Sequence, residues 1–534
     1  MGAEATARRA KSASNGASPV AGRNRVLEAI SGLVVVAVAL GVGQIAVGFV
    51  GETASPVFAI GQAAIDGSPE WLRSFAIRNF GANDKRVLVA GILVVLAIGS
   101  MLIGIVASRR PWVGYLGLVV LGGIGAIAAL SRPAARLSWA VPSLVATAAG
   151  AGAFALIRSI GYRGREFRDH AASTGREPAG FDRRRFLRAS LALTALAAAG
   201  DRLGAFVNDR RLATASRASV RIPTAASTAG QLPRADELRV PGLSPFFTSD
   251  DEFYRVDTTI FVPHVRAETW KLRIHGMVDR ELEIGFNELL ARPMIERDIT
   301  LNCVSNPVGG RYVGNARWIG TPLKPLLDEA GVHTGADQIV GRSVDGMTIG
   351  TPTAVALDGR DSMLAVAMNG QPLPFEHGFP VRMIVPGLYG YESATKWIVD
   401  MELTTLAAYD AYWVRRGWAQ VAQIKTQSRI DTPHNGAHLS QGMVPIAGVA
   451  WAQHRGISRV DVRVDGGPWN EASLSAQDTV DTWRQWVWRW SATAGDHLLE
   501  ARATDGTGAV QTEIPAPLFP NGASGLHRIV VSVG

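Results

Sequence analysis

The residue of this chain best suited to chemistry is Cys303, which lies in the stretch Thr300–Trp318, TLNCVSNPVGGRYVGNARW. It is the only cysteine among 534 residues, so the chain cannot form an internal disulfide. The residues that follow it are rich in Asn and Gly, which favour turns and loops. The sequence therefore places its one thiol at the head of a loop.

Three interpretations of this thiol are open. A lone cysteine can be a small buried hydrophobe. A nucleophilic cysteine needs a histidine base close in space, and the nearest histidines in the sequence, His275 and His333, form no recognisable arrangement with it. As a thiolate, the residue is a soft ligand for a metal ion. The residue types alone do not choose between these roles.

Charge and hydropathy differ between the two parts of the chain that must position this loop. Residues 1–210 carry 24 Lys and Arg against 12 Asp and Glu, whereas residues 211–534 carry 30 against 34. The mean hydropathy is +0.12 and 47% of the residues are hydrophobic, which is high for a soluble protein. The positive charges flank apolar runs and do not alternate with aromatic residues, so we expect a membrane segment and no nucleic-acid partner.

Four apolar runs are long enough to cross a bilayer, which takes about 20 helical residues. They are Val26–Val50, Val87–Ala107, Val113–Leu130 and Ser138–Ile157. Arginines precede the first run, separate the second from the third and follow the fourth. The positive-inside rule makes these arginine-rich regions cytoplasmic. Residues 1–169 contain no His or Cys, so we expect no haem in this part.

The segment Phe181–Gly200, FDRRRFLRASLALTALAAAG, resembles the signal of the twin-arginine export pathway. The alternative is a short fifth membrane helix with ordinary flanking charges. Under either interpretation, the segment carries the following chain out of the cytoplasm. Because membrane helices precede it, we expect the segment to remain as a membrane anchor and not to be cleaved.

The sequence after this segment predicts two outer domains. Mixed short strands and helices predict an α+β fold for the first, in which TPLKPLLDEAG is a short helix that ends at Gly331. Evenly spaced β runs, with a VDGGPW hairpin signal, predict an immunoglobulin-like sandwich without its disulfide for the second. We expect its Trp483, Trp486, Trp488 and Trp490 to pack in the core. The predicted divisions are a cytoplasmic tail (1–25), four transmembrane helices (26–160), the arginine-rich and twin-arginine-like segment (161–207), a linker (208–237), the α+β domain (238–430) and the sandwich (440–534).

The α+β region resembles the molybdenum-pterin domain of the sulfite oxidase superfamily over roughly Pro241–Ala407. Four stretches match in order, and the sandwich resembles the superfamily's second, dimerisation-type domain. The stretches are FYRVDT (Phe253–Thr258), LNCVSN (Leu301–Asn306), GNARWIGTPLKPLL (Gly314–Leu327) and HGFPVRMIVPGLYGYESATKW (His377–Trp397). The resemblance implies that Cys303 ligates molybdenum and that the cofactor is Mo-molybdopterin.

The resemblance also implies which residues bind this cofactor. Arg382 has a planar fork suited to the pterin phosphate, and Lys396 has a compact charge; in isolation the two would be interpreted as a surface ion pair. We expect hydrogen bonds to the cofactor from the following residues: Tyr254, Arg255, Asn306, His377, Ser393 and Thr395. We expect Gly309, Gly310, Gly314 and Gly390 to let the backbone approach it closely.

The sequence departs from the sulfite-oxidising members at two places. They have a tyrosine near the metal within a G-Y-A-W stretch, and this chain has Val449 at that position in GVAW. They also have arginines just after the cysteine, whereas SNPVGG is neutral until Arg311. We therefore expect weak sulfite oxidation, with Arg255 and Arg311 as the candidate catalytic cations beside Cys303.

These observations predict a multi-domain protein: an N-terminal α-helical transmembrane bundle, then an α+β molybdopterin-binding domain, then an immunoglobulin-like β-sandwich. The predicted function is oxygen-atom transfer on a sulfur- or nitrogen-containing substrate outside the cell membrane. The alternative is a membrane protein that kept this fold, lost the metal and binds a partner. The expected partners are membrane lipid, an unidentified electron donor or acceptor and a second copy of the chain bound through the C-terminal domain.

Overall fold

The structure is a computed structural model that divides into two compact units. One unit spans Met1–Asn208 with Thr259–Phe261, and the other spans Asp209–Thr258 with Val262–Gly534. The residues described are 19–51, 54–69, 84–132, 135–174, 210–230 and 238–534, together with Leu72, Phe75 and Phe80. The twin-arginine-like segment Phe181–Gly200 and the first 18 residues of the predicted cytoplasmic tail lie outside them.

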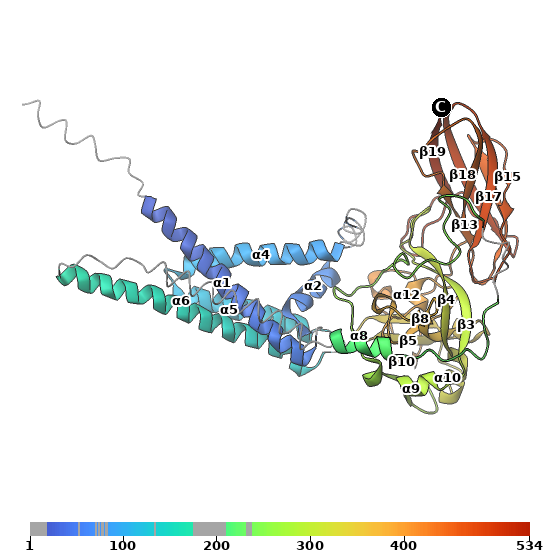
Figure 1. Ribbon diagram of the computed structural model, residues 1–534. Helices are drawn as coiled ribbons and strands as arrows, with labels where there is room; N and C mark the ends of the chain where they lie inside the picture. Colours follow the sequence, from blue (N-terminus) through green and yellow to red (C-terminus); the bar gives the residue numbers. More distant parts are fainter. Residues whose placement is uncertain are drawn as a thin grey trace, which may run out of the picture. The chain divides into compact units, whose positions relative to one another are not determined.

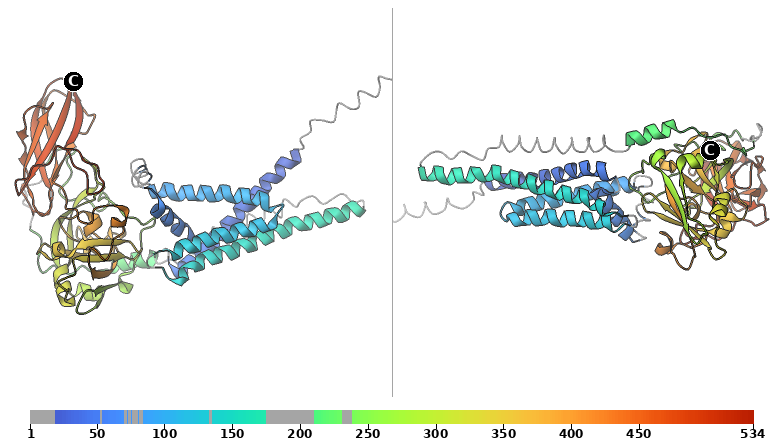
Figure 2. Two further views of the ribbon diagram at one scale, coloured as in Figure 1. Left: turned by 180° about the vertical axis from the view of Figure 1, so that it is seen from behind. Right: turned by 90° about the horizontal axis from the view of Figure 1, so that it is seen from below.

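The first unit is a bundle of helices, and it confirms the four predicted apolar helices. Four stretches are long and apolar enough to cross a membrane: Arg25–Val50, Val87–Ala107, Pro111–Leu130 and Leu137–Ser159. Figure 2 shows the long helices running alongside one another. Their bounds are α1 (Pro19–Val50), α4 (Asp84–Ala107), α5 (Pro111–Leu130) and α6 (Val141–Thr174), with the short α2 (Pro56–Gly67) and η3 (Leu137–Ala140) between them.

Glycine allows α1 and α4 to cross closely. A Cβ atom on Gly32 of α1 would lie 2.0 Å from the carbonyl oxygen of Ser100 on α4, and one on Gly104 would lie 2.5 Å from the carbonyl oxygen of Glu28. Close backbone approach at small residues is the usual means by which helices associate in lipid.

The second unit begins with one mixed and one antiparallel sheet, as the predicted α+β fold requires. One has the order β2-β1-β10-β5-β6, and the other has β3-β4-β7-β8 with β9 paired to β7. Only β1 and β10 pair in parallel within these sheets, among the strands that the structure describes. The strands are β1 (Lys271–Gly276), β2 (Leu282–Gly285), β3 (Ile295–Asn302), β4 (Val313–Pro322), β5 (Gln338–Ser343), β6 (Thr348–Pro352), β7 (Met363–Met368), β8 (Gln371–Pro372), β9 (Arg382–Ile384) and β10 (Ile398–Thr404).

Short helices connect these strands (Figure 1). In α10 the residues Leu323, Leu326 and Leu327 recur at helical spacing and are fully buried, and Gly331 ends the helix in the left-handed conformation with φ of 70°. The sequence predicted this helix and its end. The others are α8 (Arg210–Ser219), η4 (Ala267–Thr269), α9 (Phe286–Leu290), α10 (Leu323–Ala330), α11 (Thr353–Leu357), η5 (Phe375–His377), α12 (Gly390–Ser393) and η6 (Val414–Arg416).

Part of the predicted linker 208–237 is ordered. It contains α8, whose Arg217 donates hydrogen bonds of 2.8 Å and 2.7 Å to the carbonyl oxygens of Leu373 and Pro372. Val220 and Ile222, just after the helix, pack against the core of the α+β domain. These tertiary contacts order a segment whose composition alone resembles a linker.

The C-terminal part contains two sheets around a shared core, and their strands pair antiparallel except β12 with β19, which pair in parallel. Their orders are β11-β13-β17-β16 and β12-β19-β18-β14-β15. Trp486 and Trp490 lie in that core, and Trp483 lies in a second buried cluster, as predicted. Trp488 packs against the core but is only partly buried. The strands are β11 (Gln427–Thr432), β12 (His438–Leu439), β13 (Gly442–Trp451), β14 (Ile457–Val464), β15 (Asn470–Glu471), β16 (Ser473–Leu474), β17 (Arg484–Ala492), β18 (Gly495–Asp505) and β19 (His527–Val533).

The predicted hairpin signal VDGGPW lies between β14 and β15, which pair antiparallel. Asp465 and Gly466 both have positive φ, at 52° and 69°, and the Gly467 amide donates to the Val464 carbonyl oxygen at 2.9 Å. Two consecutive positive φ values are the mark of the hairpin turn that Asp-Gly favours.

The strand that leads to Cys303 is bonded to the C-terminal domain. β3 is an edge strand, and its Thr300 makes three hydrogen bonds to that domain. The Thr300 amide donates to the Asp481 carbonyl oxygen at 2.9 Å, its hydroxyl accepts from the Trp483 amide at 2.7 Å, and its carbonyl accepts from Gln453 Nε2 at 3.0 Å. The C-terminal domain thus fixes β3 close to the thiol.

Candidate active site

Cys303 directly follows β3 and begins a closed loop. Its amide donates to the Tyr312 carbonyl oxygen at 2.9 Å, and its carbonyl accepts from the Asn306 amide at 3.0 Å. Asn306 Oδ1 in turn accepts from the Tyr312 amide at 2.9 Å. The side chain of Asn306 therefore holds the loop in shape, and the residue Cys303 is 8% exposed.

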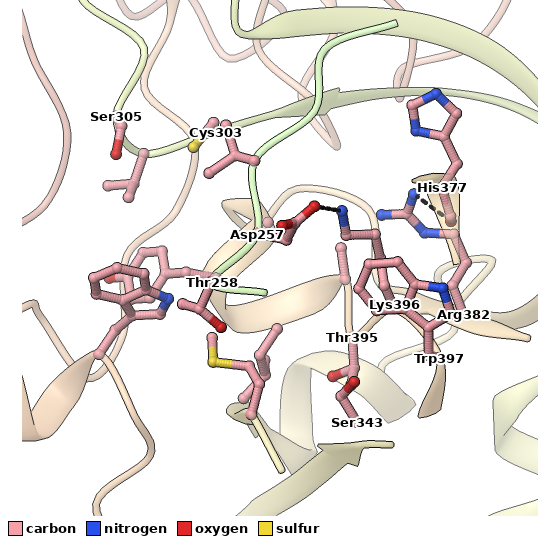
Figure 3. A pocket seen from close by; sticks show the side chains of 18 of the residues that line it. Asp257, Thr258, Cys303, Ser305, Ser343, His377, Arg382, Thr395, Lys396 and Trp397 are labelled. Carbon is pink, nitrogen blue, oxygen red and sulfur yellow. Dashed lines mark hydrogen bonds and ion pairs between the residues drawn. The ribbon is translucent and has the colours of Figure 1, made fainter. Parts of the chain in front are cut away.

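The thiol lies in the wall of a pocket that encloses about 910 Å³, part of it open to solvent. Figure 3 shows Cys303 and Ser305 on one side, and Arg382 and His377 on the opposite side. Other walls come from residues 253–258, from the turn after β5 and from residues 390–418. The elements that make this pocket are therefore far apart in the sequence.

A buried ion pair crosses the middle of the pocket (Figure 3). Lys396 Nζ lies 2.8 Å from Asp257 Oδ2 and 3.1 Å from the Glu376 carbonyl oxygen. Burial lowers the pKa of Lys396 to about 8, and Asp257 opposes that shift. Arg255 is exposed and its Nε also lies 2.7 Å from Asp257 Oδ2, so this carboxylate serves two cations.

The guanidinium of Arg382 is buried without a carboxylate partner among the described residues. It donates one hydrogen bond of 3.2 Å to the His377 carbonyl oxygen, and its buried Nε has no partner there. Burial lowers the pKa of Arg382 to about 10. A buried cation without a counter-ion is costly. An anionic group of a ligand would remove that cost.

Other residues that line the pocket have polar atoms without hydrogen-bond partners among the described residues. Thr395 Oγ1 and Ser343 Oγ are buried, belong to lining residues and have no hydrogen-bond partner among the described residues. Tyr254 also lines the pocket, and burial raises the pKa of its hydroxyl. His377 Nε2 lies 2.9 Å from the Asp250 carbonyl oxygen, and burial lowers the pKa of this histidine to about 4. At neutral pH these groups offer hydrogen bonds without adding charge.

The thiol itself is held in its protonated form when no metal is present. Burial raises the pKa of Cys303, and hydrogen bonding by Ser305 and the charge of Lys396 only partly oppose this. A bound metal ion would displace the proton, because thiolates bind metals in the deprotonated form. His377 also lines the pocket, but Figure 3 shows it on the opposite side from the thiol. This position disfavours a mechanism in which His377 activates Cys303 as a nucleophile.

The structure brings most of the predicted site residues together. Tyr254, Cys303, His377, Arg382, Thr395 and Lys396 line the one pocket. Gly390 lines it as well. Arg311 is exposed on the loop after Cys303 and is not part of the lining. Ser393 is fully buried, and its hydroxyl donates to the carbonyl oxygens of Leu388 and Tyr389, at 3.1 Å each.

Several lining residues were not predicted from the sequence. Asp257 lies two positions after Arg255 in the matching FYRVDT stretch. An acid so close to a predicted cofactor-binding arginine could have indicated an ion pair in the site. Ser343, Trp413 and Trp418 come from segments with no motif, and only the tertiary fold brings them to the pocket.

The polar groups of this pocket fit Mo-molybdopterin. That cofactor carries a phosphate, many hydrogen-bonding atoms and a metal that accepts a soft ligand. The pocket offers a buried guanidinium without a counter-ion, two unpartnered hydroxyls and one thiol.

Comparisons with known proteins agree with this fit. Residues 259–413 match the family described as the oxidoreductase molybdopterin binding domain. The chain is 30% identical over 309 residues to mitochondrial sulfite oxidase of Mus musculus, covering 48% of this chain and 56% of that protein. It is 32% identical over 158 residues to the uncharacterized oxidoreductase YuiH of Bacillus subtilis, covering 29% of this chain and 76% of that protein.

Among solved structures, the sulfane dehydrogenase SoxCD from Paracoccus pantotrophus matches with a TM-score of 0.48 and 24% identity, covering 55% of this chain and 84% of that chain. The chain spans about half the length of the mitochondrial relatives it matches. From the domain match, the relatives and the donor set of the pocket, we conclude that the chain belongs to the sulfite oxidase superfamily of molybdopterin-dependent oxidoreductases.

Proposed function

We propose that this chain is a membrane-anchored oxidoreductase that transfers an oxygen atom to or from a sulfur- or nitrogen-containing substrate outside the cytoplasm. The observation that carries the proposal is the position of Cys303, the single thiol of the chain. It lies in the wall of a pocket that also holds a buried cation without a counter-ion and unpartnered hydroxyl groups.

Each part of the pocket has a role in this proposal. Cys303 is the protein ligand of molybdenum, and Arg382 with Lys396 holds the phosphate end of the pterin. Tyr254, Thr395 and His377 donate or accept hydrogen bonds along the cofactor. When bound, the cofactor supplies two-electron oxygen-atom transfer. Arg255 and Arg311 are exposed and would act only at the entrance, on an approaching substrate.

The membrane part supports an outward-facing catalytic domain. Four helices are apolar and long enough to span a bilayer, and the flanks richest in arginine, before the first helix and after the fourth, would both be cytoplasmic by the positive-inside rule. The apolar segment Phe181–Gly200 would then carry the chain outward. Reporter fusions after Ile160 and after Gly230 should report opposite sides of the membrane. Two cytoplasmic reports would contradict this topology. The immunoglobulin-like assignment of the two C-terminal sheets and a dimer formed through them belong to the same proposal.

Sulfite is expected to be a poor substrate. Val449 is fully buried on β13, where its side chain offers no hydroxyl to a substrate or to a proton. An assay of the metal-loaded protein at low sulfite concentration checks this expectation, and rapid oxidation of sulfite would contradict it.

A second candidate is a metal-free membrane protein whose outer domain binds a partner. Molybdenum analysis of the purified protein, followed by assays with sulfite, S-oxides and N-oxides, separates the two candidates. We expect about one molybdenum per chain and turnover of at least one oxide. A folded protein without molybdenum and without turnover would favour the partner-binding role.

A further inference from the structure

Three aromatic side chains form one wall of the pocket that contains Cys303. They are Tyr391, Trp413 and Trp418, and we refer to them as the aromatic wall. The ring centroids of Tyr391 and Trp418 lie 6.0 Å apart, and those of Trp413 and Trp418 lie 6.3 Å apart at an interplanar angle of 80°. Trp418 also lies beyond the end of the matched family domain at residue 413.

Hydrogen bonds hold the aromatic wall in place. The Tyr391 hydroxyl donates to the Ala419 carbonyl oxygen at 2.8 Å, and the Ala419 amide donates to the Pro520 carbonyl oxygen at 3.0 Å. Between the two tryptophans, Gly417 adopts a positive φ of 86°, and the Trp418 amide returns to the Trp413 carbonyl oxygen at 3.2 Å. A wall fixed in this way loses little conformational entropy when a ligand packs against it.

Val449 packs in the same cluster as the aromatic wall. Trp418 and Val449 belong to one buried group, with Trp413 and Tyr391 packed against it. The position that matches the tyrosine of the sulfite-oxidising members is therefore apolar here and lies in the same hydrophobic cluster as the aromatic wall. The indole N–H of Trp418 is buried and has no hydrogen-bond partner among the described residues. An indole can only donate, which suits an oxide oxygen.

The charges of the pocket do not favour an anionic substrate. The lining contains two acids, Asp257 and Asp345, and two bases, Arg382 and Lys396. Lys396 is paired with Asp257, and the proposed phosphate would neutralise Arg382. No excess positive charge then remains in the lining for a substrate anion.

We infer that the aromatic wall selects a neutral S-oxide or N-oxide that carries an apolar or aromatic substituent. This inference rests on the proposed function and names the substrate class of the same site. The substituent would pack against Trp413 and Trp418, and the bound cofactor would supply the oxygen-atom transfer. In the direction of reduction, the S–O bond breaks and the oxygen leaves as water with two protons. The two electrons come from a one-electron carrier, which in the test is reduced benzyl viologen.

The test compares methyl phenyl sulfoxide with dimethyl sulfoxide, which differ only in the ring. The full-length, metal-loaded protein should reduce the phenyl compound with a kcat/KM at least about 10-fold higher. Trp418→Ala should lower this ratio by about 10-fold, and Trp418→Phe should keep most of it. Trp469→Ala removes a partly buried tryptophan that is not in the pocket lining and should leave the ratio unchanged. Molybdenum content and melting temperature are measured on every sample.

Three results would overturn the inference. The first is an unchanged ratio in folded Trp418→Ala with normal molybdenum content. The second is loss of molybdenum from that variant, which would make the wall part of the cofactor site. The third is a preference of the unaltered protein for sulfite or for dimethyl sulfoxide. If the unaltered protein holds no molybdenum and reduces neither sulfoxide, the proposed function itself fails.

Discussion

Buried charges in the C-terminal sheets have partners of opposite charge, whereas a buried charge in the pocket has none among the described residues. In the sheets, Glu500 has a side chain only 3% exposed, and it accepts hydrogen bonds from Arg463 at 2.5 Å and Arg528 at 2.6 Å. Its pKa lies below the ordinary value, mainly because of the hydrogen bond from Arg463. In the pocket, Arg382 has no carboxylate partner among the described residues, and burial lowers its pKa.

The difference shows what each region is built for. A buried charge with partners is satisfied by the fold alone, so removing one partner destabilises the domain whether or not a ligand is bound. A buried charge without partners lowers the stability of the unliganded protein and is retained where a ligand completes it. Substitutions in the two regions should therefore separate function from stability.

The largest effect is expected at Cys303. Cys303→Ser replaces a soft thiolate with a hard hydroxyl and should reduce turnover by more than about 100-fold. Mutating a residue that only hydrogen-bonds to a metal ligand already lowers activity by up to about 100-fold, so loss of the ligand itself should lower it further. The domain should stay folded. Turnover, molybdenum content and melting temperature are measured on one sample, with Ser428→Ala, a buried hydroxyl of the C-terminal domain, as the control. Full turnover in folded Cys303→Ser would refute the ligand assignment.

The next effect is expected at Arg382. Arg382→Gln removes a charge-assisted contact to the cofactor phosphate and should weaken cofactor retention by about 10–100-fold. The unliganded protein should melt at the same temperature or higher, because an uncompensated buried charge has gone. Cofactor content after gel filtration and the melting temperature of the cofactor-free protein check both parts. A lower melting temperature with normal cofactor content would show that Arg382 serves the fold.

Glu500→Gln should show the reverse pattern. It leaves Arg463 and Arg528 without their carboxylate and should lower the free energy of unfolding by about 2–3 kcal/mol. The kcat/KM of the surviving folded protein should stay normal, because Glu500 is not among the residues that line the pocket. Denaturant titration combined with activity measurement tests this. A loss of activity without a loss of stability would contradict the division between the two regions.

The smallest effect is a dependence on pH in the C-terminal sheets. Burial would raise the pKa of Asp505, but hydrogen bonds from Thr507, Arg455 and Thr426 outweigh it and hold the pKa at about 2, against an ordinary 3.8. Because the folded pKa is depressed, this stabilisation is present above pH 3.8 and is lost as pH falls through 2. It amounts to about 2 kcal/mol.

Asp505→Asn should therefore lower stability at pH 7 and have little effect near pH 2. Unfolding free energies measured at several pH values in this range check the prediction. An equal loss at both ends of the range would show that Asp505 acts through packing and not through its charge.

The sequence predicted those features that depend on local pattern. Hydrophobic runs predicted the four apolar helices, and the leucines of α10 with Gly331 predicted that helix and its end. The Asp-Gly pair predicted the hairpin turn before β15. Each of these signals lies within a single element, where propensity and periodicity determine the outcome.

Features that depend on long-range contacts could not be predicted in this way. The helix α8 is ordered by contacts of Arg217 with residues about 155 positions away. Trp413 and Trp418 reach the pocket because Tyr391 and Pro520 hold their loop, and no motif marks that loop. Of the candidate site, the sequence located the cofactor side through matched stretches and missed the aromatic wall.

The bonding of Thr300 to the C-terminal domain has a consequence for the solubility of separated domains. β3 is an edge strand, and Asp481, Trp483 and Gln453 cover its backbone where it approaches Cys303. An uncovered edge strand offers unpaired amides and carbonyls to another chain. A catalytic domain cut away before β11 would expose this edge beside its only thiol. Such a fragment should associate edge to edge and aggregate, whereas the intact chain keeps that strand covered.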